Sequence, residues 1–239
     1  GGLPQCSETG GQLMVNHYFI TGTDTDVGKT RVAEALLCRA RRQGLSTAAV
    51  KPVAAGCELV EGRLCNDDAL RLQRWCQPAL NYAEVNPIAL APAIAPHIAA
   101  AEAGLKLQAA DLAAATAKVL VGRADFALVE GAGGWRVPLN DSETLADLAC
   151  ALQLPVILVV GVRLGCINHA LLSAEAIVAD GLVLAGWVAN VVDPNASVVA
   201  QNIAAIDARI GAPCLGVIPW QPAPDTQMMA DLLMLPDQL

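Results

Sequence analysis

Short apolar runs, rich in β-branched residues, recur along the chain and are typical of strands buried on both faces of a parallel sheet. Turn-forming residues or helical patterns separate each run from the next. The pattern predicts strands over residues 17–21, 47–53, 124–130, 155–161, 182–191 and 214–218. Because most of these runs are too short for a helix and are nearly continuous, we expect them to form the centre of one sheet.

Apolar residues recur every three or four positions in the segments between these runs, which indicates amphipathic helices. Residues 82–96 carry three prolines and no clear period, so we expect a loop with at most one short strand there. The stretch before Asn66 is also irregular. The predicted helices cover residues 31–43, 67–75, 95–103, 107–121, 143–153, 166–180, 196–210 and 225–235.

Strands that alternate with helices predict an α/β fold with a mostly parallel β-sheet, flanked by helices on both faces and joined by right-handed crossovers. The sequence contains no internal repeat and no linker long enough to divide it, so we expect a single domain over residues 17–239. Residues 1–16 are Gly-rich and polar, and we interpret them as a disordered extension or a cloning remnant.

The composition narrows the class of protein. With 54% hydrophobic residues among 239, the chain can bury a sizeable core, yet no apolar run approaches the ~20 residues of a membrane span. A formal charge of −8 argues against a surface for nucleic acid or anionic membrane. Eight cysteines without a CxxC pair favour a reduced cytoplasmic protein, although a metal cluster at Cys57, Cys65 and Cys76 is a minor alternative.

The segment from Gly22 to Thr30, GTDTDVGKT, lies between a predicted strand and a predicted helix. Such a turn directs backbone N–H groups and the helix dipole at one point, where a polyphosphate can bind. Lys29 would then reach the outer phosphates, and the Thr30 hydroxyl would hold Mg²⁺. The spacing has one residue more than the standard pattern, so a chance Gly-Lys-Thr is the alternative; the strand and helix on either side favour a P-loop NTPase.

Three further segments carry candidate side chains. Lys51 ends a predicted strand, at the sheet edge where ligands of α/β proteins bind, although an exposed loop lysine is the alternative. Asp68 opens a helix, where an acid is usually a cap. Glu130 ends a buried strand and precedes the glycine-rich segment 131–134, which favours a metal or ligand site over a structural acid. The helix start at residues 164–169 can receive an anion such as a carboxylate.

Read in order, GTDTDVGKT, KPVAAG, NDDAL, VEGAGGWRVPL, LPVILVVGVRLGCINHA, GWVAN and IPW resemble the dethiobiotin synthetases, over residues 17 to about 221. The resemblance implies an ATP-dependent ring closure in biotin synthesis. In this reaction 7,8-diaminopelargonic acid takes up CO₂, supplied as CO₂ or bicarbonate, as a carbamate. ATP phosphorylates the carbamate, and the second amine closes the cyclic urea of dethiobiotin.

The resemblance also implies residue roles and a homodimer whose twofold interface completes the carboxylate site. The two lysines Lys29 and Lys51 would act in catalysis. Mg²⁺ would be held by Thr30, Asp68 and Glu130. ATP would contact Asp26, Val27, Gly28, Lys29, Thr30, Asn190, Pro219, Trp220 and Gln221. The substrate would contact Lys51, Glu130, Gly131, Ala132, Gly133, Gly134, Cys166, Ile167 and Asn168.

The chain departs from its relatives at Ala55, where they often carry a hydroxyl residue. The lost hydrogen bond to the substrate would cost about 1 kcal/mol.

The main alternative is a ParA- or MinD-like ATPase, but that group usually has a second lysine early in its loop, where this chain has residues 23–25. A cobyrinic acid amidating synthetase would need a glutaminase domain, and a nucleoside-phosphate kinase an Arg-rich lid. If Lys51 is exposed, Lys51→Ala should impair product formation far more than stability.

Overall fold

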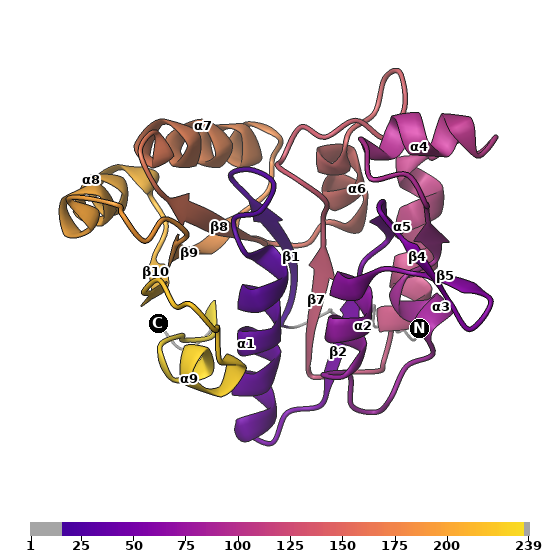
Figure 1. Cartoon of the computed structure of the whole chain (residues 1–239), viewed down its shortest axis with the longest axis horizontal. Coiled ribbons are helices and arrows are strands. Elements are labelled where there is room, and N and C mark those ends of the chain that lie inside the picture. The colour runs from indigo at the N-terminus through magenta and orange to yellow at the C-terminus, as the bar shows by residue number, and fades with distance from the viewer. Residues whose placement is uncertain (1–15, 237–239) are drawn as a thin grey trace, which may run out of the picture.

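The computed structural model of the chain describes residues 16–236 and is built around a sheet of six parallel strands (Figure 1). The expectation for the extension lies almost wholly outside the described residues. The strand order is β10-β9-β8-β1-β7-β2. The bounds are β1 (His17–Gly22), β2 (Thr47–Val50), β7 (Phe126–Glu130), β8 (Val156–Val162), β9 (Leu184–Val191) and β10 (Cys214–Ile218).

Helices cover both faces of this sheet, as the alternation of patterns predicts. The helix α1 (Lys29–Arg42) packs on β1, β2 and β7, and it contacts α2 (Asp67–Gln73) and α9 (Thr226–Asp231) beside it (Figure 1). Right-handed crossovers place the remaining long helices on the opposite face. These are α5 (Ala109–Leu120), α6 (Leu145–Leu152), α7 (Cys166–Ala179) and α8 (Val199–Ile210); α4 (Pro96–Glu102) precedes α5.

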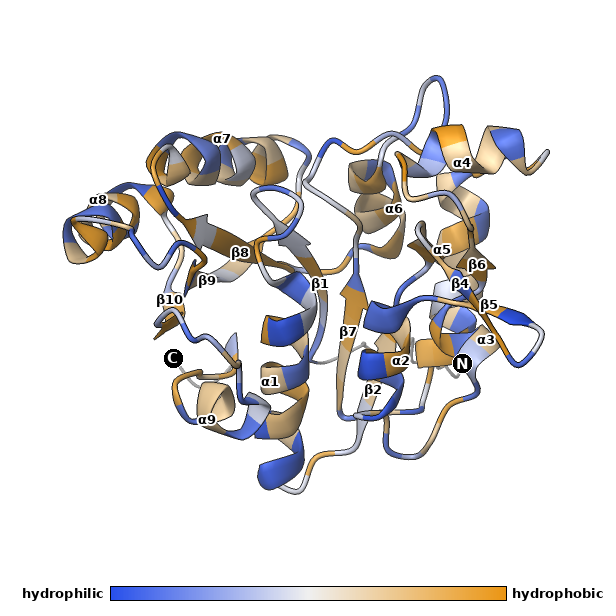
Figure 2. Cartoon of the chain, viewed as in Figure 1, coloured by the Kyte–Doolittle hydropathy of each residue, from blue (hydrophilic) through white to orange (hydrophobic). Residues whose placement is uncertain are grey.

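The apolar runs form the core between these layers. Every residue of β1, β7 and β8 is buried, and Phe19, Phe126 and Trp187 are among the largest side chains that are fully enclosed. Hydrophobic colour follows the strands and the inward sides of the helices (Figure 2). No helix among the described residues is long and apolar enough to cross a membrane.

The predicted second strand is too long, because the main-sheet strand ends at Val50 and Pro52 cannot donate to the sheet. The chain then forms β3 (Val53–Ala54), which pairs in parallel with β6 (Ile88–Ala89) outside the main sheet. Lys51 therefore stands where the chain leaves the central sheet.

Two short elements occur where the sequence was read as irregular or as loop. The strands β4 (Glu58–Val60) and β5 (Arg63–Cys65) form a hairpin whose turn residues both have positive φ. A two-residue hairpin turn that matches the twist of the strands requires positive φ at both turn residues. Here these are Glu61 and Gly62, so only one of them is a glycine. The helix α3 (Tyr82–Val85) begins with a capping box of Asn81 and Glu84. The predicted short strand is β6.

Candidate active site

The glycine-rich segment joins β1 to α1 at the carboxyl edge of the sheet, where the connections that leave β1 and its neighbour β8 run in opposite directions. Gly28, at φ 89°, is the cap residue of α1, and no side chain caps the helix. The N–H groups of its first turn are thus free to bind an anion. Lys29 is buried, and its Nζ donates to the backbone oxygen of Asp24 at 3.3 Å. Burial lowers the pKa of Lys29, although the charge of Glu130 opposes this shift.

Val27 holds this loop against the sheet through close packing with two glycines. A Cβ on Gly22 would lie 2.6 Å from Val27 Cγ2, and one on Gly161 in β8 would lie 2.7 Å from Val27 Cγ1. Only glycine therefore fits at either position without displacing the valine. Because the side chain of Val27 is buried in this contact, Val27 can offer a ligand only its backbone.

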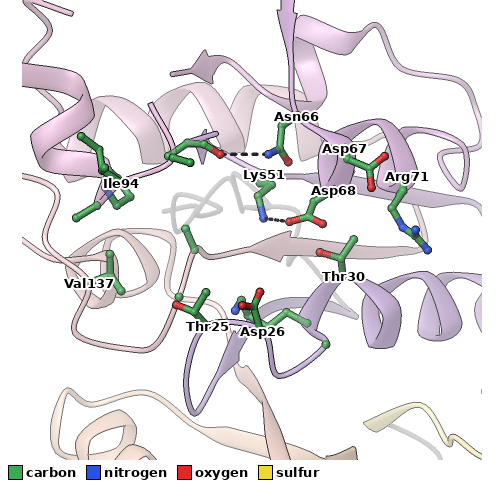
Figure 3. Close-up of a pocket in the computed structure, with 18 of the residues that line it drawn as sticks. Thr25, Asp26, Thr30, Lys51, Asn66, Asp67, Asp68, Arg71, Ile94 and Val137 are labelled. Atoms are coloured by element: carbon green, nitrogen blue, oxygen red, sulfur yellow. Dashed lines mark hydrogen bonds and ion pairs between the residues drawn. The ribbon is translucent and has the colours of Figure 1, made fainter. Parts of the chain in front are cut away.

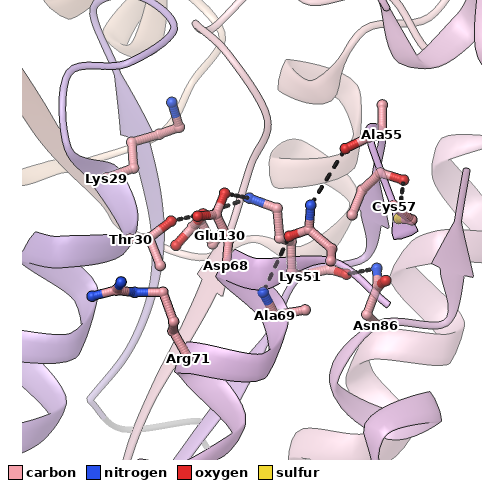
Figure 4. A network of polar contacts seen from close by, with 12 residues as sticks. Lys29, Thr30, Lys51, Ala55, Cys57, Asp68, Ala69, Arg71, Asn86 and Glu130 are labelled. Carbon is pink, nitrogen blue, oxygen red and sulfur yellow. Dashed lines mark hydrogen bonds and ion pairs between the residues drawn. The ribbon is translucent and has the colours of Figure 1, made fainter. Parts of the chain in front are cut away.

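Two side chains from separate elements meet at the carboxylate of Glu130, and one of them, Lys51, also contacts Asp68 (Figure 4). Thr30 Oγ1 donates to Glu130 Oε1 at 2.8 Å, and Lys51 Nζ donates to the same oxygen at 2.6 Å. Lys51 Nζ also donates to Asp68 Oδ2 at 3.2 Å. Lys51 directly follows β2, and Glu130 ends β7. These two strands are neighbours in the parallel sheet, which brings the two side chains together.

Lys51 is buried with only 4% of its surface exposed, so the alternative of an exposed loop lysine is wrong. Sequence alone could not reveal this, because the residues that enclose Lys51 come from distant segments. Burial by itself disfavours the charged ammonium, but the carboxylates of Glu130 and Asp68 outweigh it and raise the pKa of Lys51. The lysine is therefore a fixed cation at neutral pH.

One oxygen of Glu130 has no hydrogen-bond partner among the described residues. Glu130 is 1% exposed, and its Oε2 is buried without a donor while Oε1 accepts two hydrogen bonds. A buried carboxylate oxygen without a partner is costly, so it is expected to meet a cation or water. A hydroxyl and carboxylates around a nucleotide site are the oxygen ligands that Mg²⁺ accepts.

Asp68 does not cap its helix. The cap of α2 is Asn66, whose side chain accepts from the backbone N–H of Ala69 at 3.2 Å. The Asn66 side chain also donates to the backbone oxygen of Ala55 at 3.3 Å, which ties α2 to the segment after Lys51. The Asp68 carboxylate is thus left to face Lys51 (Figure 3).

A cavity of about 920 Å³ opens over this cluster. Sequence-predicted residues that line it are Asp26, Gly28, Lys29, Thr30, Lys51, Asp68, Ala132 and Gly133. Other lining residues were not predicted as site residues, although some of them lie within the quoted motifs: Thr25, Arg31, Asn66, Asp67, Arg71, Ala93, Ile94, Ala95, Pro96 and Val137. Ala55, at the position where relatives often carry a hydroxyl residue, lines the same cavity. Glu130 lies beneath it and reaches it through Thr30 and Lys51.

A second cavity, of about 250 Å³, adjoins the other side of the loop. The predicted residues Asn190, Pro219, Trp220 and Gln221 all line it. The side-chain nitrogen of Asn190 donates to the backbone oxygen of Val27 at 2.9 Å, which leaves its oxygen available as an acceptor. Gln221 Nε2 is buried without a partner among the described residues, so the side-chain amides of both Asn190 and Gln221 can hydrogen-bond a ligand in this cavity.

The remaining predicted contacts lie outside these two cavities. Cys166, Ile167 and Asn168 form the first turn of α7 and line neither cavity of the single chain. Gly131 and Gly134 line neither cavity as well, and a Cβ on Gly131 would lie 3.2 Å from the ring of Phe19. Gly131 therefore has a packing reason to be glycine.

Across residues 16–236, no group of three or more His, Cys, Asp or Glu side chains could hold a metal by itself. This result leaves the cysteine cluster at Cys57, Cys65 and Cys76 without support. It does not oppose a Mg²⁺ site at Thr30, because Mg²⁺ is commonly held by one or two carboxylates together with waters and substrate phosphates.

The fold resembles that of several nucleotide-binding proteins. A signal recognition particle 54 kDa protein from Aeropyrum pernix, solved with GDP, matches with a TM-score of 0.55 and 16% identity over 94% of this chain, which spans 45% of that protein. A ParA family ATPase from Chlorobium tepidum matches with a TM-score of 0.54 and 12% identity, over 87% of this chain and 85% of that one. At these identities the likeness shows the P-loop NTPase fold and nothing finer.

Sequence comparison is more specific than the fold. A family model described as an AAA domain matches residues 16–227. The ATP-dependent dethiobiotin synthetase BioD of Pseudomonas aeruginosa is 63% identical over 202 residues, which cover 84% of this chain and 89% of that protein. Identity at this level over most of both chains shows the family. The chain therefore belongs to the family of ATP-dependent dethiobiotin synthetases.

Proposed function

We propose that the chain catalyses the ATP- and Mg²⁺-dependent closure of a cyclic urea from 7,8-diaminopelargonic acid and CO₂, with ADP and phosphate as by-products, in the cytoplasm. The observation that carries the proposal is the cluster in which buried Glu130 accepts from Thr30 and Lys51, while Lys51 also donates to Asp68, beside the phosphate loop. The family of the chain supports the same reaction.

The reaction must bring two anions together. One amine of the substrate attacks CO₂ and loses a proton, which gives a carbamate. A carbamate oxygen attacks the γ-phosphorus of ATP, and ADP leaves with the bonding electrons. The second amine then attacks the carbamate carbon, phosphate leaves with the carbamate oxygen, and a second proton is released. Carbamate and γ-phosphate repel each other, so the site must supply fixed positive charge.

Lys51 and Lys29 are the cations that serve this purpose. Lys51 is held at the floor of the larger cavity by Glu130 and Asp68, so its charge does not need to be reorganised during the reaction. Lys29 lies in the loop, and its hydrogen bond to Asp24 is long enough to be exchanged for a phosphate oxygen. We assign carbamate and phosphate stabilisation to Lys51 and the transferring phosphoryl group to Lys29.

Thr30, Asp68 and Glu130 would hold Mg²⁺, directly or through water. The partnerless oxygen of Glu130 and the hard oxygen donors around it fit that ion. When bound, Mg²⁺ supplies charge that neutralises the β- and γ-phosphates. The same carboxylates fix Lys51 in place at the floor of the larger cavity.

The nucleotide would lie across both cavities. The N–H groups of residues 26–30 would bind the phosphates, and the base would occupy the smaller cavity at Asn190 and residues 219–221. The free oxygen of Asn190 would accept from an exocyclic amino group, as adenine has. The apolar faces of Pro219 and Trp220 suit a flat ring.

The diamine would lie in the larger cavity along Ala132 and Gly133, within the segment 131–134. Its carboxylate would bind at the first turn of α7, residues 166–168, of the second copy in a homodimer. The absence of this turn from the cavities of one chain supports the need for a second copy. Ala55 offers no side-chain hydrogen bond, so the backbone and charged groups carry the recognition.

The direct test is phosphate release from ATP with Mg²⁺ and bicarbonate, with and without 7,8-diaminopelargonic acid, while dethiobiotin is followed by mass. We expect release that depends on the diamine and equals product formation. Slow release that ignores the diamine, without product, would overturn the proposal and favour an ATPase that acts by binding partners.

A further inference from the structure

The larger and smaller cavities meet at a junction formed by Asp26, Gly28 and Arg31. Among the described residues, only these line both cavities, and Arg31 is the one cation of the set. Arg31 directly follows Thr30 on the first turns of α1. A ligand that extends from one cavity to the other must therefore pass its side chain.

The guanidinium of Arg31 is held loosely. Its Nη1 lies 3.9 Å from Glu34 Oε2, the same oxygen that accepts from Arg71 Nη2 at 2.6 Å and from Arg71 Nε at 2.9 Å. The other oxygen of Glu34 accepts from Trp75 Nε1 at 3.4 Å. Glu34 is thus satisfied by α2 and its flank without Arg31, and 38% of the Arg31 side chain is exposed, compared with 18% for Arg71.

We propose that Arg31 is a nucleotide-binding residue whose guanidinium binds the phosphate nearest the nucleoside, at the junction of the two cavities. The inference rests on the proposed use of ATP, with the base in the smaller cavity and the outer phosphates at Lys29. The phosphate between them must lie at the junction, where Asp26 would otherwise be the nearest charged side chain. A guanidinium matches phosphate oxygens in charge and in planar geometry.

This position predicts a specific effect on binding. The phosphate nearest the nucleoside is present in ATP, ADP and AMP, and it is not transferred in the reaction. Arg31 therefore contributes equally to the ground state and the transition state, so its loss should raise the KM for ATP and leave kcat unchanged.

The experiment compares the affinity of the wild type and Arg31→Ala for ATP, ADP and AMP, by displacement of a fluorescent ADP analogue. We expect the variant to lose roughly 10-fold in affinity for each of the three nucleotides. Arg42→Ala is the matched control, because it removes the same charge from the last turn of the same helix, where Arg42 pairs with Asp231. We expect that control to bind all three nucleotides as the wild type does.

Arg31→Lys gives a second readout. It keeps the charge without the planar fork, so we expect an affinity between those of the wild type and Arg31→Ala. Unchanged affinity for AMP in Arg31→Ala, or a loss confined to ATP, would overturn the inference. Wild-type binding of ADP without formation of dethiobiotin would refute the proposed reaction instead and leave the Arg31 test intact. Absence of all nucleotide binding by the wild type would overturn both.

Discussion

Lys51 and Glu130 form an ion pair in which both side chains are nearly inaccessible to solvent. Removal of one partner from such a pair leaves the other charge buried and typically costs 3 to 5 kcal/mol, roughly, of unfolding free energy. The expectation that Lys51→Ala would spare stability depended on an exposed lysine, and the burial of Lys51 overturns its premise. Activity and stability must therefore be measured separately at this residue.

We predict that Lys51→Met abolishes dethiobiotin formation and lowers the unfolding free energy by about 3 kcal/mol at neutral pH. The methionine fills the space of the lysine but leaves Glu130 without its cation. Steady-state turnover and urea unfolding measure the two effects. Lys51→Arg is the control, because it keeps the charge and should recover more stability than activity. A fully active Lys51→Met variant would contradict the role of the lysine.

The raised pKa of Lys51 predicts how the difference in unfolding free energy between the wild type and Lys51→Met depends on pH. A lysine whose folded-state pKa is raised stabilises the fold fully below its unfolded pKa, which is about 10.4, and less as pH rises through the folded value. The gap between the wild type and Lys51→Met should thus stay constant from pH 7 to 9 and narrow only above pH 10. Urea unfolding across this pH range measures the difference. If the difference disappears by pH 9, the ion pair of Lys51 and Glu130 is not the cause of the lost stability.

The loop between β1 and α1 is positioned by packing as well as by its own backbone. A Cβ on Gly161 of β8 would lie 2.7 Å from Val27 Cγ1, so a substitution in a neighbouring strand can push the loop out of place. Conformational freedom is not the issue at Gly161, because its φ is not positive. The requirement is space for Val27.

We predict that Gly161→Ala weakens ATP binding by at least 10-fold, and that the double variant Gly161→Ala, Val27→Ala recovers most of the loss. Gly186→Ala is the matched control, because its Cβ would lie 2.7 Å from Leu215, away from the loop. That variant should lose stability and keep its affinity for ATP. Calorimetry measures the affinity for ATP, and thermal unfolding measures stability. If the double variant does not recover affinity for ATP, contact with Val27 is not the reason for the loss.

The six main strands could be predicted from their apolar runs, because a strand buried on both faces has almost no polar position. Two features of the fold could not be predicted from the sequence. The exit of the chain from the sheet after Val50 depends on Pro52 and on the pairing of β3 with a strand more than thirty residues later. The hairpin turn at Glu61 and Gly62 lacks the Asn-Gly or Asp-Gly pair that marks such turns.

The site was only partly visible in the sequence for a similar reason. The loop motif identified Lys29 and Thr30 directly, whereas the side chains around Glu130 were joined by resemblance to relatives. Arg31 and Arg71, which line the larger cavity, carry no motif, and their place there depends on how α2 packs against α1. A cavity wall built from several elements has no local pattern that could be recognised beforehand.

In the single chain, the groups proposed to bind the nucleotide line the two cavities, whereas the first turn of α7, where the substrate carboxylate is proposed to bind, lines neither. Leu164, just before the first turn of α7, is 99% exposed in the single chain. Its position beside this turn makes Leu164 a suitable place to test whether a second copy covers this surface. The proposed homodimer would bring that turn to the diamine of its partner.

We predict that Leu164→Glu weakens dimer formation and raises the KM for the diamine by at least 10-fold, while ATP affinity is unchanged. The new charge would be buried at the proposed interface, and the groups proposed to bind ATP lie within one chain. Analytical ultracentrifugation and steady-state kinetics measure the two effects. A monomeric wild type with full activity would rule out the shared site.

The reaction proposed for the Glu130 cluster requires attack by a carbamate oxygen on the γ-phosphate. A rapid single turnover with ¹⁸O-labelled CO₂, followed by mass analysis of phosphate and dethiobiotin, tests this step. We expect one labelled oxygen in the released phosphate and one in the urea carbonyl, because the carbamate oxygen leaves with phosphorus. Release of unlabelled phosphate while dethiobiotin forms would rule out this step.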